Sequence, residues 1–223
     1  MPYVIGAPID LADFLALPPD GNAYARDERG RLALMSPEDA THHAIPQSNL
    51  THRLVEGVAR GHRVFPRPSI ALPKIFDLDG NLQRESFLGP KTLEPDLACY
   101  AHRPAVKVGP GGATFLLPAG LLLGVEILSA GTWKSDLGIG EGDQVDKKRS
   151  YLESGVPEYW VVNAGVRRRA CPVPVRSVRA WTSIGRGKSR RWEEIPIEAE
   201  VLRSRSMPGV EIDLASYWDD CGL

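Results

Sequence analysis

The sequence is short of cysteine and of long hydrophobic runs, and both absences narrow the class of protein. Its 223 residues hold three cysteines, an odd number with no CxxC pair, which argues against a disulfide framework or a zinc cluster. The longest apolar stretch, FLLPAGLLLGV, is interrupted by Pro118 and Gly120 and is too short to span a membrane. The N-terminus lacks the basic segment and apolar core of a signal peptide. We therefore expect a soluble, cytoplasmic protein.

The sequence also lacks a charge imbalance. Its 27 basic residues nearly match its 28 acidic residues, and the formal net charge is −1, unlike the strongly basic balance of a dedicated nucleic-acid binder. Basic residues do gather locally at 167–169 and 186–191, with Trp181 and Trp192 near them. Such a region can hold a phosphate backbone, but hairpin exteriors often carry arginine for solubility, and we favour that interpretation.

Several catalytic motifs are absent. No GxSxG or HExxH pattern occurs, and the sequence shows no internal repeat. The glycine-rich stretch GPGGATF at 109–115 lacks the lysine and Ser/Thr of a phosphate-binding loop, so it predicts a surface loop. With 43% hydrophobic and 25% charged residues, the composition is that of an ordinary globular protein.

Hydrophobic periodicity predicts alternating strands and helices along most of the chain. The expected strands lie at 31–36, 95–100, 121–129 and 158–163, and the expected helices lie at 9–17, 37–60 and 143–154. The strand at 121–129 is nearly continuous in Leu, Val and Ile, as in a strand buried on both faces. The order strand, helix, strand from 121 to 163 indicates a βαβ unit.

The remaining segments predict irregular or antiparallel structure. The proline-rich stretch 63–75 indicates an irregular or edge strand, and DLDGN at 77–81 is typical of a hairpin turn. VEIDL at 210–214 predicts the last strand. We expect one α/β domain over residues 1–223 with a central mixed sheet; its core spans about 30–165, and a C-terminal antiparallel β extension spans about 166–223.

Two carboxylates fall within strands that are otherwise apolar. Asp96 follows Pro95 at the start of PDLACY, and Glu126 lies in the middle of LLLGVEILS. An ionised carboxylate in the interior is unfavourable unless it is paired, hydrogen-bonded or bound to a metal. A salt bridge with an arginine is one explanation for Glu126. The other is that two carboxylates on neighbouring strands hold Mg²⁺ while a lysine orients a water, as in metal-assisted phosphodiester hydrolysis.

The segments PDLACY, GVEILSAGTW and DKKRSYLESGVPEYWVVN resemble the Uma family of restriction endonucleases, a large bacterial group with the PD-(D/E)XK nuclease fold. GRLALMSPEDATHH at 30–43 is similar to the N-terminal signature of that family, and SMPGVEIDLASYW is similar to its closing strand. The resemblance implies a restriction-endonuclease-like mixed sheet flanked by helices, and hydrolysis of DNA phosphodiester bonds with Mg²⁺ or Mn²⁺. A homodimer is a family-level expectation for enzymes that cut two strands.

The resemblance also assigns site residues. Asp96 matches the motif Asp and Glu126 the motif Glu, so both are expected to bind the metal. Leu128 stands where the ordinary pattern has its catalytic lysine, and the family supplies that lysine from the following helix. The matching position here is Lys147. Lys148 is the runner-up, because it points about 100° away on a helix.

Two further parts of the expected site carry alternatives. The helix-opening histidine of the family matches His43, which would contact a scissile phosphate or a metal-bound water, or would only cap the helix. The acid that the family places upstream of its lysine matches either Asp136 or Asp143. Asp143 lies four residues before Lys147 and would share a helix face with it.

This chain departs from the family near its N-terminus and in one loop. Ala25 stands where the family has a glutamate, so that acid is absent or replaced by Asp27 or Glu28. The loop between SAGTW and DKKRSY is also longer than usual. Both departures favour an alternative function, in which the same fold is a non-catalytic module that binds nucleic acid or protein. Hydrolysis of a nucleotide is a third hypothesis.

Overall fold

The computed structural model describes residues 7–9, 23–26, 32–35, 40–83, 91–109, 112 and 114–223. The helix expected at 9–17 lies outside these residues apart from Ile9, and so do Asp27 and Glu28. Strands β1 (Ala23–Arg26) and β2 (Leu32–Met35) form an antiparallel pair. The strand expected at 31–36 is therefore confirmed.

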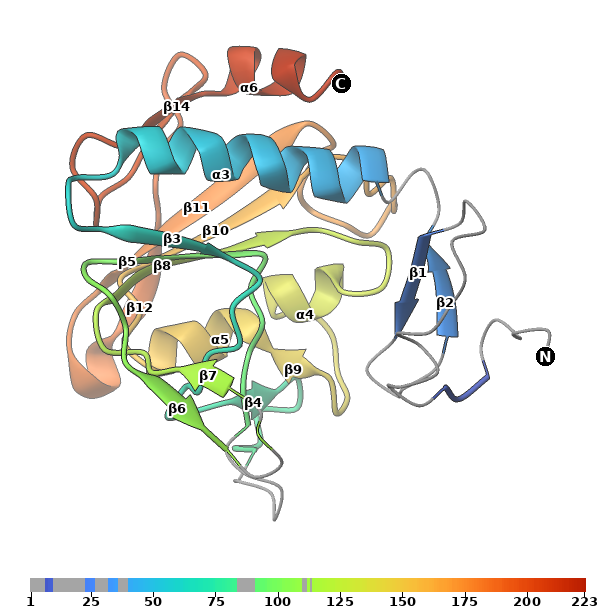
Figure 1. Ribbon diagram of the computed structural model, residues 1–223, viewed down its shortest axis with the longest axis vertical. Coiled ribbons are helices and arrows are strands. Elements are labelled where there is room, and N and C mark those ends of the chain that lie inside the picture. The colour runs from blue at the N-terminus through green and yellow to red at the C-terminus, as the bar shows by residue number, and fades with distance from the viewer. Residues whose placement is uncertain are drawn as a thin grey trace.

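A six-stranded sheet forms the centre of the molecule (Figure 1). Its order is β12-β11-β10-β8-β5-β3, and its strands are β3 (Arg63–Pro66), β5 (Leu97–Tyr100), β8 (Leu121–Ile127), β10 (Glu158–Asn163), β11 (Ser177–Ile184) and β12 (Arg191–Glu194). Only the β8–β10 pair is parallel; the other pairs are antiparallel. The mixed sheet matches the expected fold class, and the proline-rich β3 lies at its edge, where a missing N–H is tolerated.

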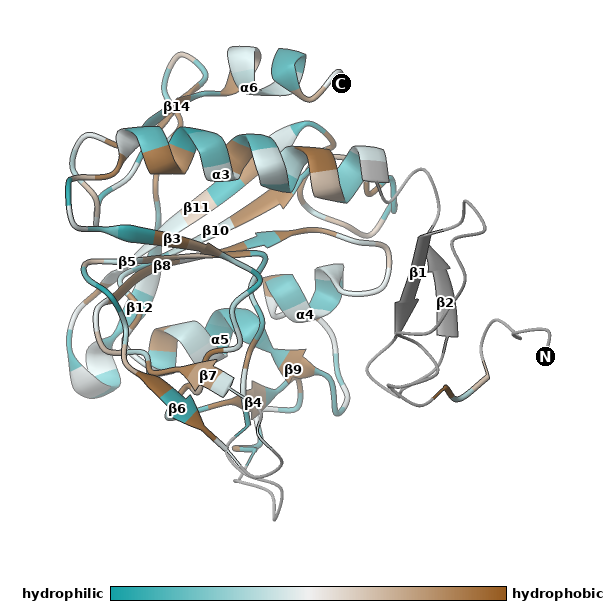
Figure 2. Ribbon diagram, viewed as in Figure 1, coloured by the Kyte–Doolittle hydropathy of each residue, from teal (hydrophilic) through white to brown (hydrophobic). Residues whose placement is uncertain are grey.

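Helices cover both faces of this sheet, so the fold is α/β with a mostly antiparallel centre. A π-helical turn, η1 (Ala40–Ala44), leads into α3 (Ile45–Gly57), which lies on one face, while α4 (Trp133–Leu137) and α5 (Lys147–Glu153) lie on the other (Figure 1). Helix α3 is amphipathic, with brown stripes between teal ones in Figure 2, and it buries Pro46, Leu50 and Leu54. Pro46 lies in the first turn of α3, where its missing N–H breaks no helical bond. None of the described helices is long and apolar enough to cross a bilayer.

Alternation along β8 divides its side chains between the two faces. Leu123, Val125 and Ile127 join α3 in one hydrophobic core, whereas Leu128 packs in a second core with residues of α4 and α5. Because successive side chains of a strand point to opposite faces, Glu126 points away from the first core and toward α4 and α5. The fold thus directs one carboxylate into the second layer of the molecule.

The connection between β8 and β10 differs from its prediction at two places. Helix α4 is present where only a loop was expected, and it ends at Gly138, whose φ of 64° places it in the left-handed region. The helix expected at 143–154 begins only at Lys147. The residues before it form β9 (Val145–Asp146), which pairs with β4 (Phe76–Asp77). Asp146 then caps the helix by accepting a hydrogen bond from the Arg149 N–H. The βαβ unit itself is confirmed by the parallel pairing of β8 and β10.

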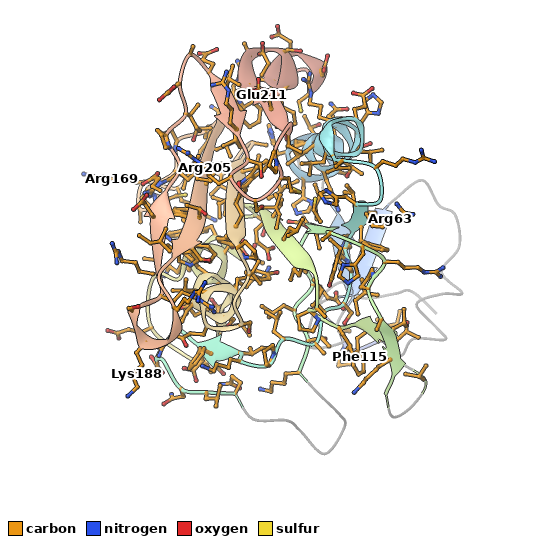
Figure 3. All side chains as sticks on the ribbon, turned by 90° about the vertical axis from the view of Figure 1, so that its left-hand side faces the viewer. Arg63, Phe115, Arg169, Lys188, Arg205 and Glu211 are labelled. Carbon is orange, nitrogen blue, oxygen red and sulfur yellow. The ribbon has the colours of Figure 1, made fainter. Side chains whose placement is uncertain are left out.

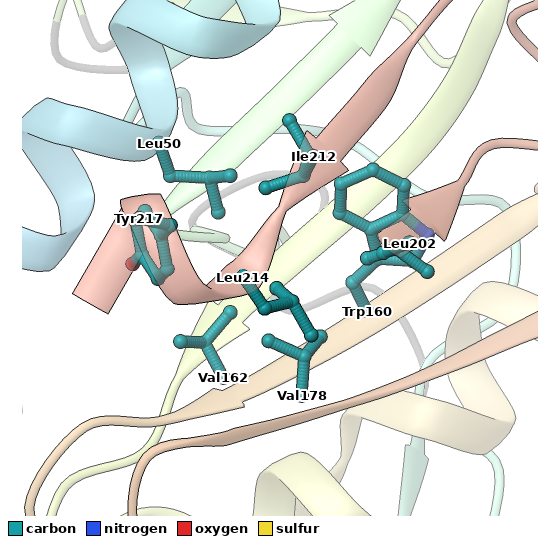
Figure 4. Close-up of a pocket in the computed structure, with 8 residues that line it drawn as sticks. All are labelled: Leu50, Trp160, Val162, Val178, Leu202, Ile212, Leu214 and Tyr217. Atoms are coloured by element: carbon teal, nitrogen blue, oxygen red, sulfur yellow. The ribbon is translucent and has the colours of Figure 1, made fainter. Parts of the chain in front are cut away.

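The C-terminal segment continues the central sheet and then covers its first face. Strands β11 and β12 are joined by a 3₁₀ turn, η3 (Gly187–Ser189), and are followed by the pair β13 (Val201–Arg203) and β14 (Glu211–Asp213), and by α6 (Leu214–Asp220). The strand expected at 210–214 is confirmed by β14. A small apolar space between α3, α6 and the sheet (Figure 4) has no room for a water molecule and belongs to the core; it is lined by Leu50, Trp160, Val162, Val178, Leu202, Ile212, Leu214 and Tyr217.

The structure also locates the glycine-rich stretch and the basic residues of the tail. The hairpin β6 (Val106–Val108) and β7 (Thr114–Leu116) flanks the glycine-rich stretch. The basic residues of the tail do not form one patch, because Arg169 and Lys188 lie well apart in Figure 3, at opposite ends of β11.

Candidate active site

Asp96 and Glu126 lie side by side at one end of neighbouring strands. Residue 96 comes directly before β5, and the β5–β8 register sets Leu97 opposite Val125, so that Asp96 falls next to Glu126. The Asp96 carboxylate also reaches across the pair, because its Oδ2 accepts a hydrogen bond of 2.7 Å from the Ile127 N–H. The structure therefore brings together the two carboxylates that sequence analysis selected.

Lys147 contacts Glu126 directly. Its Nζ lies 2.7 Å from Glu126 Oε2, and the Glu126 side chain is 2% exposed while that of Lys147 is 18% exposed. One turn further along α5, the Tyr151 hydroxyl donates to Glu126 Oε1 at 3.3 Å. Residues four apart on a helix share a face, so α5 presents an ammonium and a phenol to the same carboxylate. The longer loop therefore does not keep the Lys147 ammonium from reaching Glu126.

Asp136 is the third acid of the cluster. It lies on α4, is 1% exposed, and has its Oδ1 at 2.9 Å from Lys147 Nζ, while its Oδ2 accepts a hydrogen bond of 2.7 Å from Thr132 Oγ1. Asp143 is exposed and precedes the start of α5, so it does not share a helix face with Lys147. The structure thus places Asp136, and not Asp143, beside the lysine. The sequence offered little reason to choose Asp136 over Asp143, because a helix of only five residues is too short for hydrophobic periodicity to reveal it.

His43 lies at the same end of the sheet. Its Nε2 is 3.2 Å from Asp96 Oδ1, and it belongs to the π-helical turn that precedes α3. One turn later, Gln47 donates to the main-chain oxygen of Asp96 at 2.7 Å, a contact that sequence analysis did not anticipate. The N-terminal end of the helix therefore holds the aspartate through both its side chain and its backbone.

Lys148 does not reach these acids. Its Nζ lies 3.6 Å from the centre of the Trp181 ring, and its pKa is lowered to about 8 by burial and by the nearby charge of Arg179. Lys148 therefore lies apart from the acids, against Trp181, and is not a fully solvated surface residue. Glu94, the other acid beside Pro95, is exposed.

The cluster contains more negative than positive charge. Burial raises the pKa of Glu126 well above its usual value, and the charges of Asp136 and Asp96 add to that rise while Lys147 opposes it. Burial also raises the pKa of Asp136, again against Lys147. For Lys147, burial lowers the pKa, but the two acids outweigh that effect and raise it. Lys147 is therefore charged at neutral pH, between acids that repel each other.

The same competition acts on His43. Burial lowers its pKa, but the hydrogen bond and charge of Asp96 raise it more, and the net pKa lies above the usual value. Because a histidine of raised pKa stays protonated closer to neutral pH, His43 is suited to donate a hydrogen bond to an anion.

The donor set of the cluster fits a hard divalent cation in its chemistry. Asp96, Glu126 and Asp136 supply only oxygen atoms, and the partner of the buried Asp136 Oδ1 is the ammonium of Lys147 at 2.9 Å. No group of three or more His, Cys, Asp and Glu side chains among the described residues has the geometry to hold a metal ion. Mg²⁺ often binds through one or two carboxylates and keeps several waters, so a site for this ion does not need three protein ligands.

The sequence pattern of a known protein family matches most of the chain. The Uma2 family, described as "Putative restriction endonuclease", matches residues 11–215. A crystal structure described as a "putative nuclease belonging to DUF820", from Anabaena variabilis, aligns with 96% of this chain and 99% of its own, at a TM-score of 0.49 and 15% sequence identity. No curated protein matches the sequence.

Proposed function

Because the chain belongs to the Uma2 family of restriction-endonuclease-like proteins, we propose that it is a metal-dependent nuclease that hydrolyses phosphodiester bonds of DNA. The observation that carries this proposal is the contact of the Lys147 ammonium with Glu126 at 2.7 Å and with Asp136 at 2.9 Å, next to Asp96. Adjacent acids and a lysine are the groups that metal-assisted phosphodiester hydrolysis needs.

In this proposal Asp96 and Glu126 are the protein ligands of Mg²⁺ or Mn²⁺. A bound divalent ion would supply a water of lowered pKa and would offset the charge of the phosphate. The burial of Glu126 and the excess of acids support this assignment, because a cation relieves the repulsion that raises the pKa of Glu126.

Lys147 acts as a charged hydrogen-bond donor. Its raised pKa makes it a poor base at neutral pH, so it orients the attacking water and stabilises negative charge that develops on the phosphate. Asp136 is a positioning residue, since it contacts Lys147 and is itself held by Thr132. His43, held by Asp96, donates a hydrogen bond to a phosphate oxygen.

The test is cleavage of supercoiled plasmid and of single-stranded DNA by the full chain with Mg²⁺ or Mn²⁺. We expect Glu126→Gln and Lys147→Ala each to reduce the cleavage rate by at least about 100-fold. Lys188→Ala is the matched control, because that exposed lysine lies in the turn between β11 and β12 and its loss should leave the rate unchanged. Cleavage that survives both site substitutions would sink the proposal.

A second candidate function is a non-catalytic module that keeps this fold. The observation in its favour is that Lys147 pairs with Glu126 and Asp136 and so neutralises part of the acidic cluster by itself. Such a module would bind DNA or protein without any rise in melting temperature on addition of Mg²⁺ or Mn²⁺. A metal-dependent rise that is lost in Asp96→Asn would select the nuclease instead.

The proposal includes two points about assembly. We propose that residues 1–223 act as one nuclease domain, because β11 and β12 of the C-terminal segment belong to the same sheet as the site. A homodimer is the arrangement expected if the protein cuts both strands of a duplex. Sedimentation of the full chain, alone and with duplex DNA, tests that expectation.

A further inference from the structure

Arg67, Asp96 and Glu126 lie side by side across the sheet, at the ends of β3, β5 and β8. The Arg67 N–H donates a hydrogen bond of 2.9 Å to the main-chain oxygen of Asp96, which continues the β3–β5 register one step beyond the pair Pro66–Leu97. Asp96 in turn lies next to Glu126. Since neighbouring strands are about 4.8 Å apart, the Arg67 backbone lies about 5 Å from that of Asp96 and about 10 Å from that of Glu126.

The backbone of Arg67 is strained. Its φ is 45°, in the left-handed region that residues other than glycine rarely adopt. Pro68 follows it, and a residue before proline is normally restricted to extended conformations. Such conformations persist where the surrounding structure holds them, and they gather at functional sites. Here the hydrogen bond to Asp96 ties the strained residue to the proposed site.

Among the described residues, no acid forms an ion pair with the Arg67 side chain. It is exposed, and no carboxylate of the described residues lies within ion-pair distance of it. Its charge is nevertheless close enough to His43 to act against the rise in the pKa of that imidazole. An exposed guanidinium that forms no ion pair with a described acid therefore lies near a cluster whose other charged groups are mostly acids.

We propose that Arg67 binds a backbone phosphate of the nucleic acid beside the phosphate that is cut. The inference rests on the proposed function in that the site acts on a phosphodiester chain. A polyanion that approaches Asp96, Glu126 and Asp136 meets repulsion. A nearby guanidinium that pairs with none of the described acids offers a bidentate hydrogen bond to phosphate oxygens. Contacts of this kind fix the register of the strand without reading its sequence.

The test measures binding without cleavage. The full chain, in EDTA, is titrated onto a fluorescent duplex of about 20 base pairs and its single strand, at salt concentrations from about 50 to 300 mM. Arg67→Ala should weaken binding about tenfold, as expected for one lost charged hydrogen bond. The slope of log K against log salt should become shallower by about 0.9 for the duplex or about 0.7 for the single strand.

Arg63→Ala is the matched control. Arg63 is exposed at the start of β3, and within the described residues its side chain hydrogen-bonds the main-chain oxygen of His62. Its register partner is Tyr100, at the end of β3 away from the acids. Its loss should change neither affinity nor slope. Arg67→Gly separates binding from folding: glycine accepts a φ of 45°, so this variant should bind as weakly as Arg67→Ala while unfolding at no lower temperature than the wild type.

Each outcome decides between the two proposals. If the wild type binds DNA and Arg67→Ala weakens that binding no more than Arg63→Ala does, the role of Arg67 is overturned. The nuclease proposal then still stands. Binding that depends on Arg67, in a protein that cuts no DNA with Mg²⁺ or Mn²⁺, supports Arg67 and overturns the nuclease proposal. No detectable binding of wild type to either DNA at 50 mM salt overturns the role of Arg67.

Discussion

Replacing Lys147 by methionine tests whether the buried charges are coupled as the structure indicates. Methionine has a similar volume but no charge, so the variant leaves Glu126 and Asp136, each 1% exposed, without the ammonium at 2.7 and 2.9 Å. Removing one partner of a buried ion pair costs about 3–5 kcal/mol. For a chain of this size that corresponds to a fall in Tm of roughly 6–20 °C.

The loss should depend on pH in a defined direction. Glu126 and Asp136 have raised pKa values in the folded wild type, with burial as the first cause and Lys147 as the opposing one. A carboxyl whose folded pKa exceeds its unfolded value of about 4 destabilises the fold above that unfolded value, and the penalty disappears when both states are protonated. Without Lys147 the folded pKa values rise further. The loss of unfolding free energy in Lys147→Met should therefore be smallest near pH 4 and grow as the pH rises toward 8.

The assay is urea unfolding of wild type and Lys147→Met at several pH values between 4 and 8. Lys74→Met is the control, because its ion pair with Glu153 is 49% and 39% exposed and surface pairs contribute about 0–1 kcal/mol. The double variant Lys147→Met with Glu126→Gln should regain part of the loss, since it removes one of the two stranded charges. A deficit that is the same at pH 4 and pH 8, or a double variant no more stable than the single one, refutes the coupling.

Three further predictions concern the site and its support. Asp96→Asn should abolish plasmid cleavage while Glu94→Gln, at the exposed neighbouring acid, keeps it; equal loss in both would remove Asp96 from the site. Since the pKa of His43 is raised, activity that needs the protonated ring should fall as the pH rises through that pKa. His43→Gln should flatten this limb of the pH–rate profile, and a limb that stays unchanged argues against His43. Glu158 is fully buried, and its Oε2 accepts hydrogen bonds from Ser204 and Ser206. Glu158→Gln should therefore lower the free energy of unfolding by about 1–3 kcal/mol. A free energy from chemical denaturation within about 0.5 kcal/mol of the wild-type value would contradict this.

The sequence by itself determined the main strands and the acids they carry. A nearly continuous apolar run specifies a strand buried on both faces, and 121–129 became β8 with little change. Within such a run a lone carboxylate needs a partner, which singled out Glu126. The period of two in a strand implied that residues 126 and 128 share a face, and the family resemblance implied that Leu128 stands where the ordinary pattern has a lysine.

Helix boundaries in the connection were less predictable. Helix α4 has five residues and α5 has seven, too few for hydrophobic periodicity to show. The residues 143–146 looked helical in sequence, but Val145 and Asp146 pair with β4, about 70 residues earlier in the chain. This non-local pairing shifted the helix start to Lys147 and removed Asp143 from consideration.

Only the tertiary structure decided which charges meet. The loop from Ser129 to Asp146 contains α4, and its path brings Asp136 to the ammonium of Lys147. Loop closure costs little more when a loop lengthens by a few residues, so the extra length did not prevent the lysine from reaching Glu126. The place of Arg67 likewise depends on the pairing of β3 with β5. Local sequence specifies strands and isolated charges, whereas contacts between residues far apart depend on how the strands align and on where the loops between them return.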